Sequence, residues 1–129
     1  MGDFTTQRIA GYLNLSGTYQ TGAVLLTIGR RAGMDGKELF DALSRGSADS
    51  FVLRNHGMKA VLPDTFPERA FSTEYALKDL SYALDLASQA GLAPKGAEVA
   101  RTYLTQAAEQ GFGKLYWPVV NRIISKSVT

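Results

Sequence analysis

The side chain that is the best candidate for binding or catalysis is Lys78, in the stretch ALKDLSYAL. It lies one residue from Leu77 and two from Leu80, at the edge of the apolar face of a predicted helix. A lysine at such an edge either covers apolar surface with its alkyl chain while its charge stays in water, or presents a positioned ammonium. In the second case it would bind an anionic substrate group or a cofactor amide. Both interpretations stay open on these residues alone.

Other familiar patterns of catalytic or binding residues fail on inspection. The stretch GTYQTG at 17–22 has the glycine spacing of a phosphate loop, but Ala23 and Val24 stand where Lys and Ser or Thr are required. The stretch GFGK at 111–114 follows a predicted helix and lacks the third glycine of a dinucleotide fingerprint. The chain has no cysteine, and His56 is its single histidine. Disulfides, thiolate sites and histidine-rich metal sites are therefore excluded, and we expect no metal.

Length and composition indicate one ordinary globular domain covering residues 1–129. The hydrophobic fraction of 45% and the charged fraction of 20% are typical of a folded protein with its own core. A net charge of +2, with basic residues scattered along the chain, does not favour a nucleic-acid partner. The absence of cysteine fits a cytoplasmic location, which we expect.

The stretch from Ile9 to Ile28 contains no charged residue and predicts a long, buried central helix. As a helix it would be ~30 Å long. Its polar residues argue against a membrane span, and MGDFTTQ has no basic region typical of a signal peptide. Gly11, Gly22 and Gly29 place small residues on one side of this helix. They indicate either a tight crossing within one domain or a crossing between two chains.

Capping residues and apolar spacing predict six helices and no strand. We expect them from about Thr6 to Gly33, from Asp35 to Arg45, over 50–62 with Ser47 or Asp49 as cap and Gly57 as a weak point, from Thr73 to Gly91, over 97–110 before Gly111, and over 114–126 with Pro118 in the first turn. The predicted inner faces are Tyr75, Ala76, Leu80, Ala83, Leu84 and Ala87 in the fourth helix and Val99, Tyr103, Leu104 and Ala107 in the fifth. The one loop contains Pro63 and Pro67. The fold class is therefore all-α, with about six helices around a long central helix.

Four stretches carry a resemblance to a known family: AGMD, LSRGSADSFVLRN, FSTEYALKDLSYALDLASQAGL and AAEQGFGKLYWPVV, in this order. From Arg8 to Ile124 the chain resembles the C-terminal helical domain of the β-hydroxyacid dehydrogenases, the family of 3-hydroxyisobutyrate dehydrogenase and tartronate semialdehyde reductase. The resemblance implies a fold like the C-terminal domain of 6-phosphogluconate dehydrogenase.

The resemblance also implies a cofactor and partners. In this family an N-terminal Rossmann domain binds NAD or NADP, and the helical domain covers the substrate and pairs with a second subunit. Residues 1–129 contain no Rossmann fingerprint. We therefore expect NAD or NADP to bind only when a Rossmann domain is supplied, and we expect a homodimer.

Arg8 is the position at which the chain departs from the family pattern. Aligned through AGMD, Arg8 falls on the family's catalytic lysine, and Gly11 and Tyr12 fall on its asparagines. An arginine can orient a carboxylate, but with a pKa above ~12 it is a poor proton donor or acceptor near neutral pH. This change argues against ordinary hydroxyacid oxidation.

Three other positions match the family pattern. The resemblance implies that Ser47 and Phe71 line the substrate cleft and that Lys78 faces the nicotinamide. The first hypothesis is therefore a substrate-covering and dimerisation domain of an NAD(P)-dependent oxidoreductase, inactive in isolation. The alternative is a free-standing helical interaction module that has lost catalysis.

Overall fold

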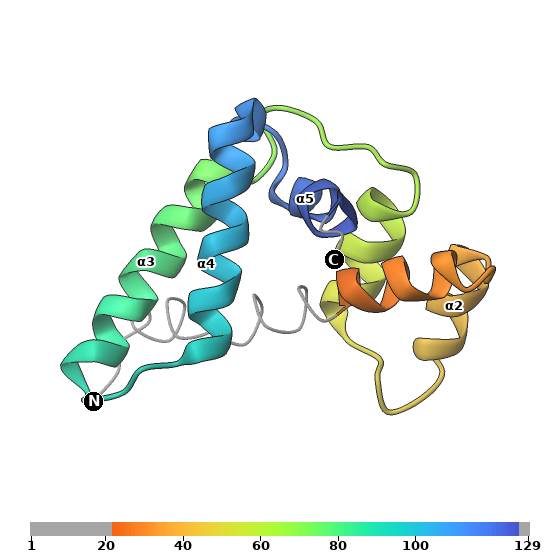
Figure 1. Cartoon of the computed structure of the whole chain (residues 1–129), viewed down its shortest axis with the longest axis horizontal. Coiled ribbons are helices and arrows are strands. Elements are labelled where there is room, and N and C mark those ends of the chain that lie inside the picture. Colours follow the sequence, from red (N-terminus) through yellow and green to blue (C-terminus); the bar gives the residue numbers. More distant parts are fainter. Residues whose placement is uncertain (1–21, 127–129) are drawn as a thin grey trace.

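The computed structural model describes residues 22–126 of the chain (Figure 1). These residues are mainly helical, and the all-α prediction is confirmed. Outside the helices, the only strand-like pairings within 22–126 are two isolated antiparallel bridges, Glu68 with Leu115 and Ser72 with Tyr116. Arg8, Gly11, Tyr12 and the expected helix start at Thr6 lie outside the described residues.

The described helical segment at 22–31 ends where the sequence predicted the end of its first helix. Helical residues run to Arg31, and Gly33 follows with a φ of +89°. The Gly33 N–H donates to the Arg30 carbonyl at 3.0 Å and the Met34 N–H donates to the Gly29 carbonyl at 2.9 Å. This is the hydrogen-bond pattern of a helix end closed by a left-handed glycine. The carbonyl groups of the last turn are therefore paired, and the chain turns toward α2.

The next helix, α2, spans Gly36–Leu43 with Asp35 as its N-cap, as predicted. The Asp35 carboxylate accepts a hydrogen bond from the Glu38 N–H at 3.1 Å. A side chain at Gly29 would place its Cβ 2.7 Å from Leu39 Cδ2, whereas a Cβ at Gly22 would meet nothing within 4 Å. At Gly29, the missing side chain therefore serves a tight crossing within this chain.

The third helix is wound differently from the prediction. After Phe51 and Val52 it continues as a π-helix, η1, over Leu53–Val61. The Leu62 N–H donates to the Gly57 carbonyl five residues back, at 3.0 Å. A Cβ at Gly57 would lie 2.9 Å from Phe40 Cε2, so the glycine makes room for a buried ring. Gly57 therefore supports this helix through packing and does not break it.

The predicted caps of this helix, Ser47 and Asp49, were wrong. The Ser50 hydroxyl accepts a hydrogen bond from the Leu53 N–H at 3.0 Å. Ser50 directly precedes the first helical residue, so its side chain reaches the free N–H groups of the first turn. Asp49 instead forms an ion pair with Arg54 at 3.0 Å.

The helices α3 (Thr73–Gln89) and α4 (Lys95–Ala107) pack against each other and are seen side by side in Figure 1. The predicted cap of α3, Thr73, was wrong by one residue. The Ser72 hydroxyl accepts from the Tyr75 N–H at 3.1 Å, which makes Ser72 the cap. Thr73 is fully buried, and its hydroxyl donates to the Leu115 carbonyl at 3.0 Å.

The inner faces of these two helices are lined mainly by small residues. The buried residues are Ala76, Leu80, Ala83, Leu84 and Ala87 on α3, and Ala97, Ala100, Leu104 and Ala107 on α4. Two bulky residues predicted for these faces lie outside: Tyr75 is 53% exposed and Val99 is 45% exposed. Alanines on facing helices let the backbones approach closely, and Tyr75 and Val99 lie outside this contact.

The described residues end with a helical segment that contributes buried side chains to the core. A short π-turn, η2, covers Ala108–Phe112, followed by η3 at Trp117–Val119 and α5 at Val120–Lys126. Pro118 lies in the first turn, as predicted, and is buried. In Figure 1, α5 lies between the α3 and α4 pair and the side formed by α2 and η1. Within 22–126, none of the helices combines the length and apolar character needed to span a membrane.

Candidate functional site

Lys78 lies on the exposed side of α3, between two tyrosine rings. Its Nζ is 5.8 Å from the ring centroid of Tyr75 and 5.9 Å from that of Tyr82. Tyr75 precedes Lys78 by three residues and Tyr82 follows it by four, so all three share one helix face. Both rings remain about half exposed. The rings hold the ammonium by cation–π attraction, and no carboxylate of the described segment pairs with it.

Phe71 extends this aromatic group toward the start of α3. Its ring centroid is 5.4 Å from that of Tyr75, at an edge-on angle of 61°. Phe71 is half-buried, and its carbonyl accepts a hydrogen bond from the Trp117 N–H at 2.9 Å. The structure therefore connects two of the residues singled out in the sequence, Phe71 and Lys78, through Tyr75.

Main-chain hydrogen bonds anchor this end of α3. The N–H and the hydroxyl of Thr73 both donate to the Leu115 carbonyl, at 2.8 and 3.0 Å. The Glu74 N–H donates to the Gly113 carbonyl at 2.9 Å. A Cβ at Gly113 would collide with the Glu74 side chain, so the two segments are in close contact. The aromatic and cationic groups of α3 are thus carried by a fixed helix start and not by a free loop.

Ser47 lies apart from this group. It is exposed in the turn that follows α2. In Figure 1, α2 and α3 lie at opposite sides of the molecule. Within the described residues of one chain, Ser47 therefore does not join Phe71 and Lys78. Arg8 lies outside the described residues, and the roles of all four positions stay predictions.

The two tyrosines around Lys78 were the residues that sequence reasoning missed. Tyr75 was assigned to the buried face, and Tyr82 was not considered. The signal was present in the sequence, because Tyr75, Lys78 and Tyr82 follow each other at spacings of three and four. This spacing places two rings beside one ammonium on any regular helix.

A second aromatic group surrounds His56 and includes Phe51, Tyr116 and Trp117. The His56 Nδ1 is in hydrogen-bond contact with the Tyr116 hydroxyl. The His56 ring centroid is 5.1 Å from that of Trp117 and 6.2 Å from that of Phe51. Burial lowers the pKa of His56 and raises the pKa of Tyr116, so both groups favour their neutral forms. A neutral imidazole Nδ1 pairs with a tyrosine hydroxyl as acceptor or donor according to its tautomer, and this pair joins η1 to the segment before η3.

Metal binding has no support in the described part of the chain. No group of three or more histidine, cysteine, aspartate or glutamate side chains gathers there. Around Lys78, α3 presents an ammonium and two aromatic faces, groups that attract anionic or carbonyl oxygens and cations respectively.

Comparisons with known proteins point to one enzyme family. Residues 14–115 match the profile of a family described as NAD-binding of NADP-dependent 3-hydroxyisobutyrate dehydrogenase. The chain also superposes on the crystal structure of 3-hydroxyisobutyrate dehydrogenase from Salmonella typhimurium, with a TM-score of 0.83 and 23% identity. That alignment covers 92% of this chain and 41% of the Salmonella protein. No curated protein sequence matches.

Proposed function

Because this chain belongs to the 3-hydroxyisobutyrate dehydrogenase family, we propose that it is the helical domain that covers the substrate in an NAD(P)-dependent oxidoreductase of this kind. The family match spans most of the chain, whereas the chain spans less than half of the Salmonella relative. A Rossmann domain would supply the glycine turn and the acidic ribose ligand that hold a dinucleotide. In this proposal the Rossmann domain binds the dinucleotide, and this chain covers the substrate and forms part of the cleft.

The observation that carries the proposal is the arrangement around Lys78. Its ammonium is exposed, lies between Tyr75 and Tyr82, and has no carboxylate partner in the described segment. An ammonium can donate up to three hydrogen bonds and attracts carbonyl or carboxylate oxygens. In the proposed complex, Lys78 donates to the carboxamide of the nicotinamide, and the half-buried Phe71 covers the same cleft.

Other parts of the proposal rest on the family alone. Ser47 would contribute to the substrate turn, and Arg8 would orient a substrate carboxylate in place of the family lysine. Since arginine keeps its proton near neutral pH, another group would have to transfer a proton. We also propose that the chain forms a homodimer and acts in the cytoplasm, without a nucleic-acid or membrane partner.

Cofactor titration in the presence and absence of a Rossmann domain tests the proposal. The probes are NADPH and NADH, added to the full chain alone or mixed with a separately produced Rossmann domain of the kind that the family resemblance implies. We expect no saturable micromolar binding by the chain alone. With the Rossmann domain present, Lys78→Ala should weaken cofactor binding roughly tenfold, because a charge-assisted hydrogen bond is lost.

A charge-matched control separates this effect from a general loss of positive charge. Lys95 is exposed at the start of α4, outside the Lys78 aromatic group, which consists of Phe71, Tyr75, Lys78 and Tyr82. Lys95→Ala should leave cofactor binding unchanged. Equal effects of Lys78→Ala and Lys95→Ala would argue against a specific role for Lys78, and micromolar binding by the chain alone would contradict the need for a Rossmann domain.

The alternative function is a helical interaction module without catalysis. The replacement of the family lysine by Arg8, and of the asparagines by Gly11 and Tyr12, favours it. Leu25 and Ile28, three residues apart, add an exposed apolar edge on the long helix. This alternative predicts stable self-association with no cofactor binding even when the Rossmann domain is supplied.

A further inference from the structure

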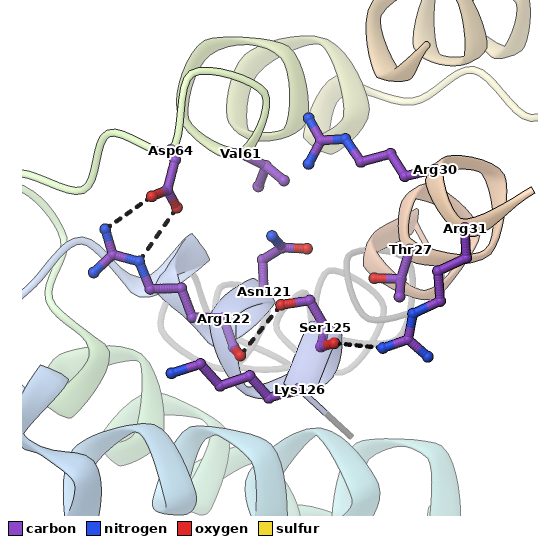
Figure 2. Close-up of a pocket in the computed structure, with 9 residues that line it drawn as sticks. All are labelled: Thr27, Arg30, Arg31, Val61, Asp64, Asn121, Arg122, Ser125 and Lys126. Atoms are coloured by element: carbon purple, nitrogen blue, oxygen red, sulfur yellow. Dashed lines mark hydrogen bonds and ion pairs between the residues drawn. The ribbon is translucent and has the colours of Figure 1, made fainter. Parts of the chain in front are cut away.

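A polar hollow of about 480 Å³ lies between the end of the helical segment at 22–31, the end of η1 and α5 (Figure 2). Its charged and amide-bearing lining residues are Arg30, Arg31, Asp64, Asn121, Arg122 and Lys126. It is built from elements other than α3, so it is separate from the Lys78 aromatic group. Its volume is within the range of pockets that hold small organic ligands.

The residues that line the hollow carry more positive than negative charge. Four of its lining residues are cationic and one, Asp64, is a carboxylate. Asp64 is already held by Arg122 through two hydrogen bonds of 3.2 and 3.1 Å. Arg122 also lies over Phe66, with its guanidinium carbon 5.0 Å from the ring centroid. This pair is therefore engaged within the chain.

Three cations remain without a carboxylate partner in the described part of the chain: Arg30, Arg31 and Lys126. Arg31 uses one of its N–H groups to donate to the Ser125 carbonyl at 2.7 Å, which holds its guanidinium at the end of α5. Like charges in one hollow repel each other, and an anion bound among them relieves that repulsion. Guanidinium groups also match the oxygens of a phosphate in geometry.

Asn121 adds an unpaired hydrogen-bond acceptor to the lining of the hollow. It is only 7% exposed, and its Oδ1 has no hydrogen-bond partner. Figure 2 shows its amide inside the hollow, between Val61 and Thr27. A buried carbonyl oxygen without a donor is uncommon, because it has lost its hydrogen bonds to water without replacement. A deprotonated phosphate oxygen cannot donate to this acceptor, but a hydroxyl group on the same ligand can.

We propose that this hollow binds a phosphorylated small molecule that carries a hydroxyl group. Arg30, Arg31 and Lys126 attract the phosphate, and the Asn121 Oδ1 accepts a hydrogen bond from the hydroxyl. The proposal does not depend on the proposed oxidoreductase function, because it uses no residue of the Lys78 aromatic group and no cofactor.

Three probes of graded chemistry test the proposal by calorimetric titration of the full chain. They are glycerol 3-phosphate, inorganic phosphate and glycerol. Glycerol 3-phosphate should bind at least about tenfold more tightly than inorganic phosphate, because it adds one hydrogen bond to a buried acceptor. Glycerol alone should not bind measurably. Added salt should lower the affinity of the chain for both phosphate ligands, because it screens the attraction between charges.

Two variants separate the charge from the amide. Arg30→Gln should lower the affinity for both phosphate ligands roughly tenfold. Asn121→Leu should abolish the preference for glycerol 3-phosphate over inorganic phosphate. It should also raise the urea midpoint of unfolding, because it removes an unpaired buried acceptor. The control Lys95→Gln removes one exposed positive charge elsewhere and should change neither affinity.

Two results would overturn the proposal. One is equal affinity for the two phosphate ligands in the wild-type chain, which would indicate an unselective basic surface. The other is an equal loss of binding in Arg30→Gln and Lys95→Gln, which would indicate general charge attraction. If Asn121→Leu does not fold, Arg30→Gln and the wild-type preference among the probes still decide the question.

Discussion

At the scale of single residues, His56 couples protonation to folding. Its Nδ1 contacts the Tyr116 hydroxyl, and the rings of Phe51, Tyr116 and Trp117 surround it. Burial lowers its pKa below the ordinary value of 6.5 in the folded chain. At a pH near and below 6.5, the imidazole of the unfolded chain binds more protons than that of the folded chain does. Stability from this group is therefore complete above the ordinary pKa and is lost as the pH falls through it toward the folded pKa.

We accordingly predict that the urea midpoint of unfolding falls when the pH is lowered from about 7.5 to about 5.5. His56 is the only histidine of the chain, so this change should come mainly from one group. The substitution His56→Gln removes the titration and should flatten the pH dependence. Tyr116→Phe keeps the half-buried ring and removes only the hydroxyl, so it should retain a pH dependence. A wild-type midpoint that is constant over this pH range would contradict the prediction.

At the scale of elements, the π-helix η1 owes its place to a contact between Gly57 and Phe40. The Phe40 ring is almost completely buried and is the largest fully buried side chain of the described residues. The absence of a side chain at Gly57 lets this ring lie against the η1 backbone. A π-turn widens the helix locally, and such turns often mark places where function or packing outweighs helix propensity.

Gly57→Ala should therefore destabilise the fold, by about 1–3 kcal/mol, because overpacking forces a rigid core to shift. The matched control is Gly96→Ala in the first turn of α4, where a new Cβ would meet nothing within 4 Å. There we expect no loss of stability, or a gain of up to about 1 kcal/mol from helix propensity. Urea denaturation of both variants measures the difference, and equal effects would show that the contact with Phe40 is unimportant.

At the scale of the whole molecule, the helical segment at 22–31 carries two exposed apolar side chains. Leu25 is 39% exposed and Ile28 is 59% exposed, and both lie on the same side of the helix. Gly29 is occupied by the crossing with Leu39 and so is not free to serve a second chain. A homodimer, as proposed from the family, would find its apolar contact at Leu25 and Ile28.

We predict a concentration-dependent dimer by sedimentation velocity, which the double variant Leu25→Gln with Ile28→Gln shifts to monomer. Exchanging two apolar contacts for polar groups should weaken association by about tenfold or more. The control is Leu92→Gln, since Leu92 is 67% exposed in the turn after α3. A monomeric wild-type chain, or equal loss of dimer in the control, would contradict this interface.

Local signals in the sequence were sufficient for the helical fold and for the helix boundaries at Gly33 and Asp35, and four stretches carried the resemblance to the family. Caps and apolar spacing act over a few neighbouring residues, so they can be read without tertiary structure. The caps are Ser50 and Ser72, and not the predicted residues, because Asp49 forms an ion pair with Arg54 and the Thr73 hydroxyl donates to the Leu115 carbonyl. These choices were made by partners that neighbouring residues do not reveal.

Only the tertiary structure decided which polar residues meet. It connected Phe71 with Lys78 through Tyr75, left Ser47 on the opposite side, and brought Arg30 and Arg31 to Asn121 and Lys126. Within the polar hollow, the hydrogen bond from Arg31 to Ser125 joins residues that are 94 positions apart in the sequence. The periodicity of a helix sets which residues share its face, but the packing of helices against one another sets which faces meet.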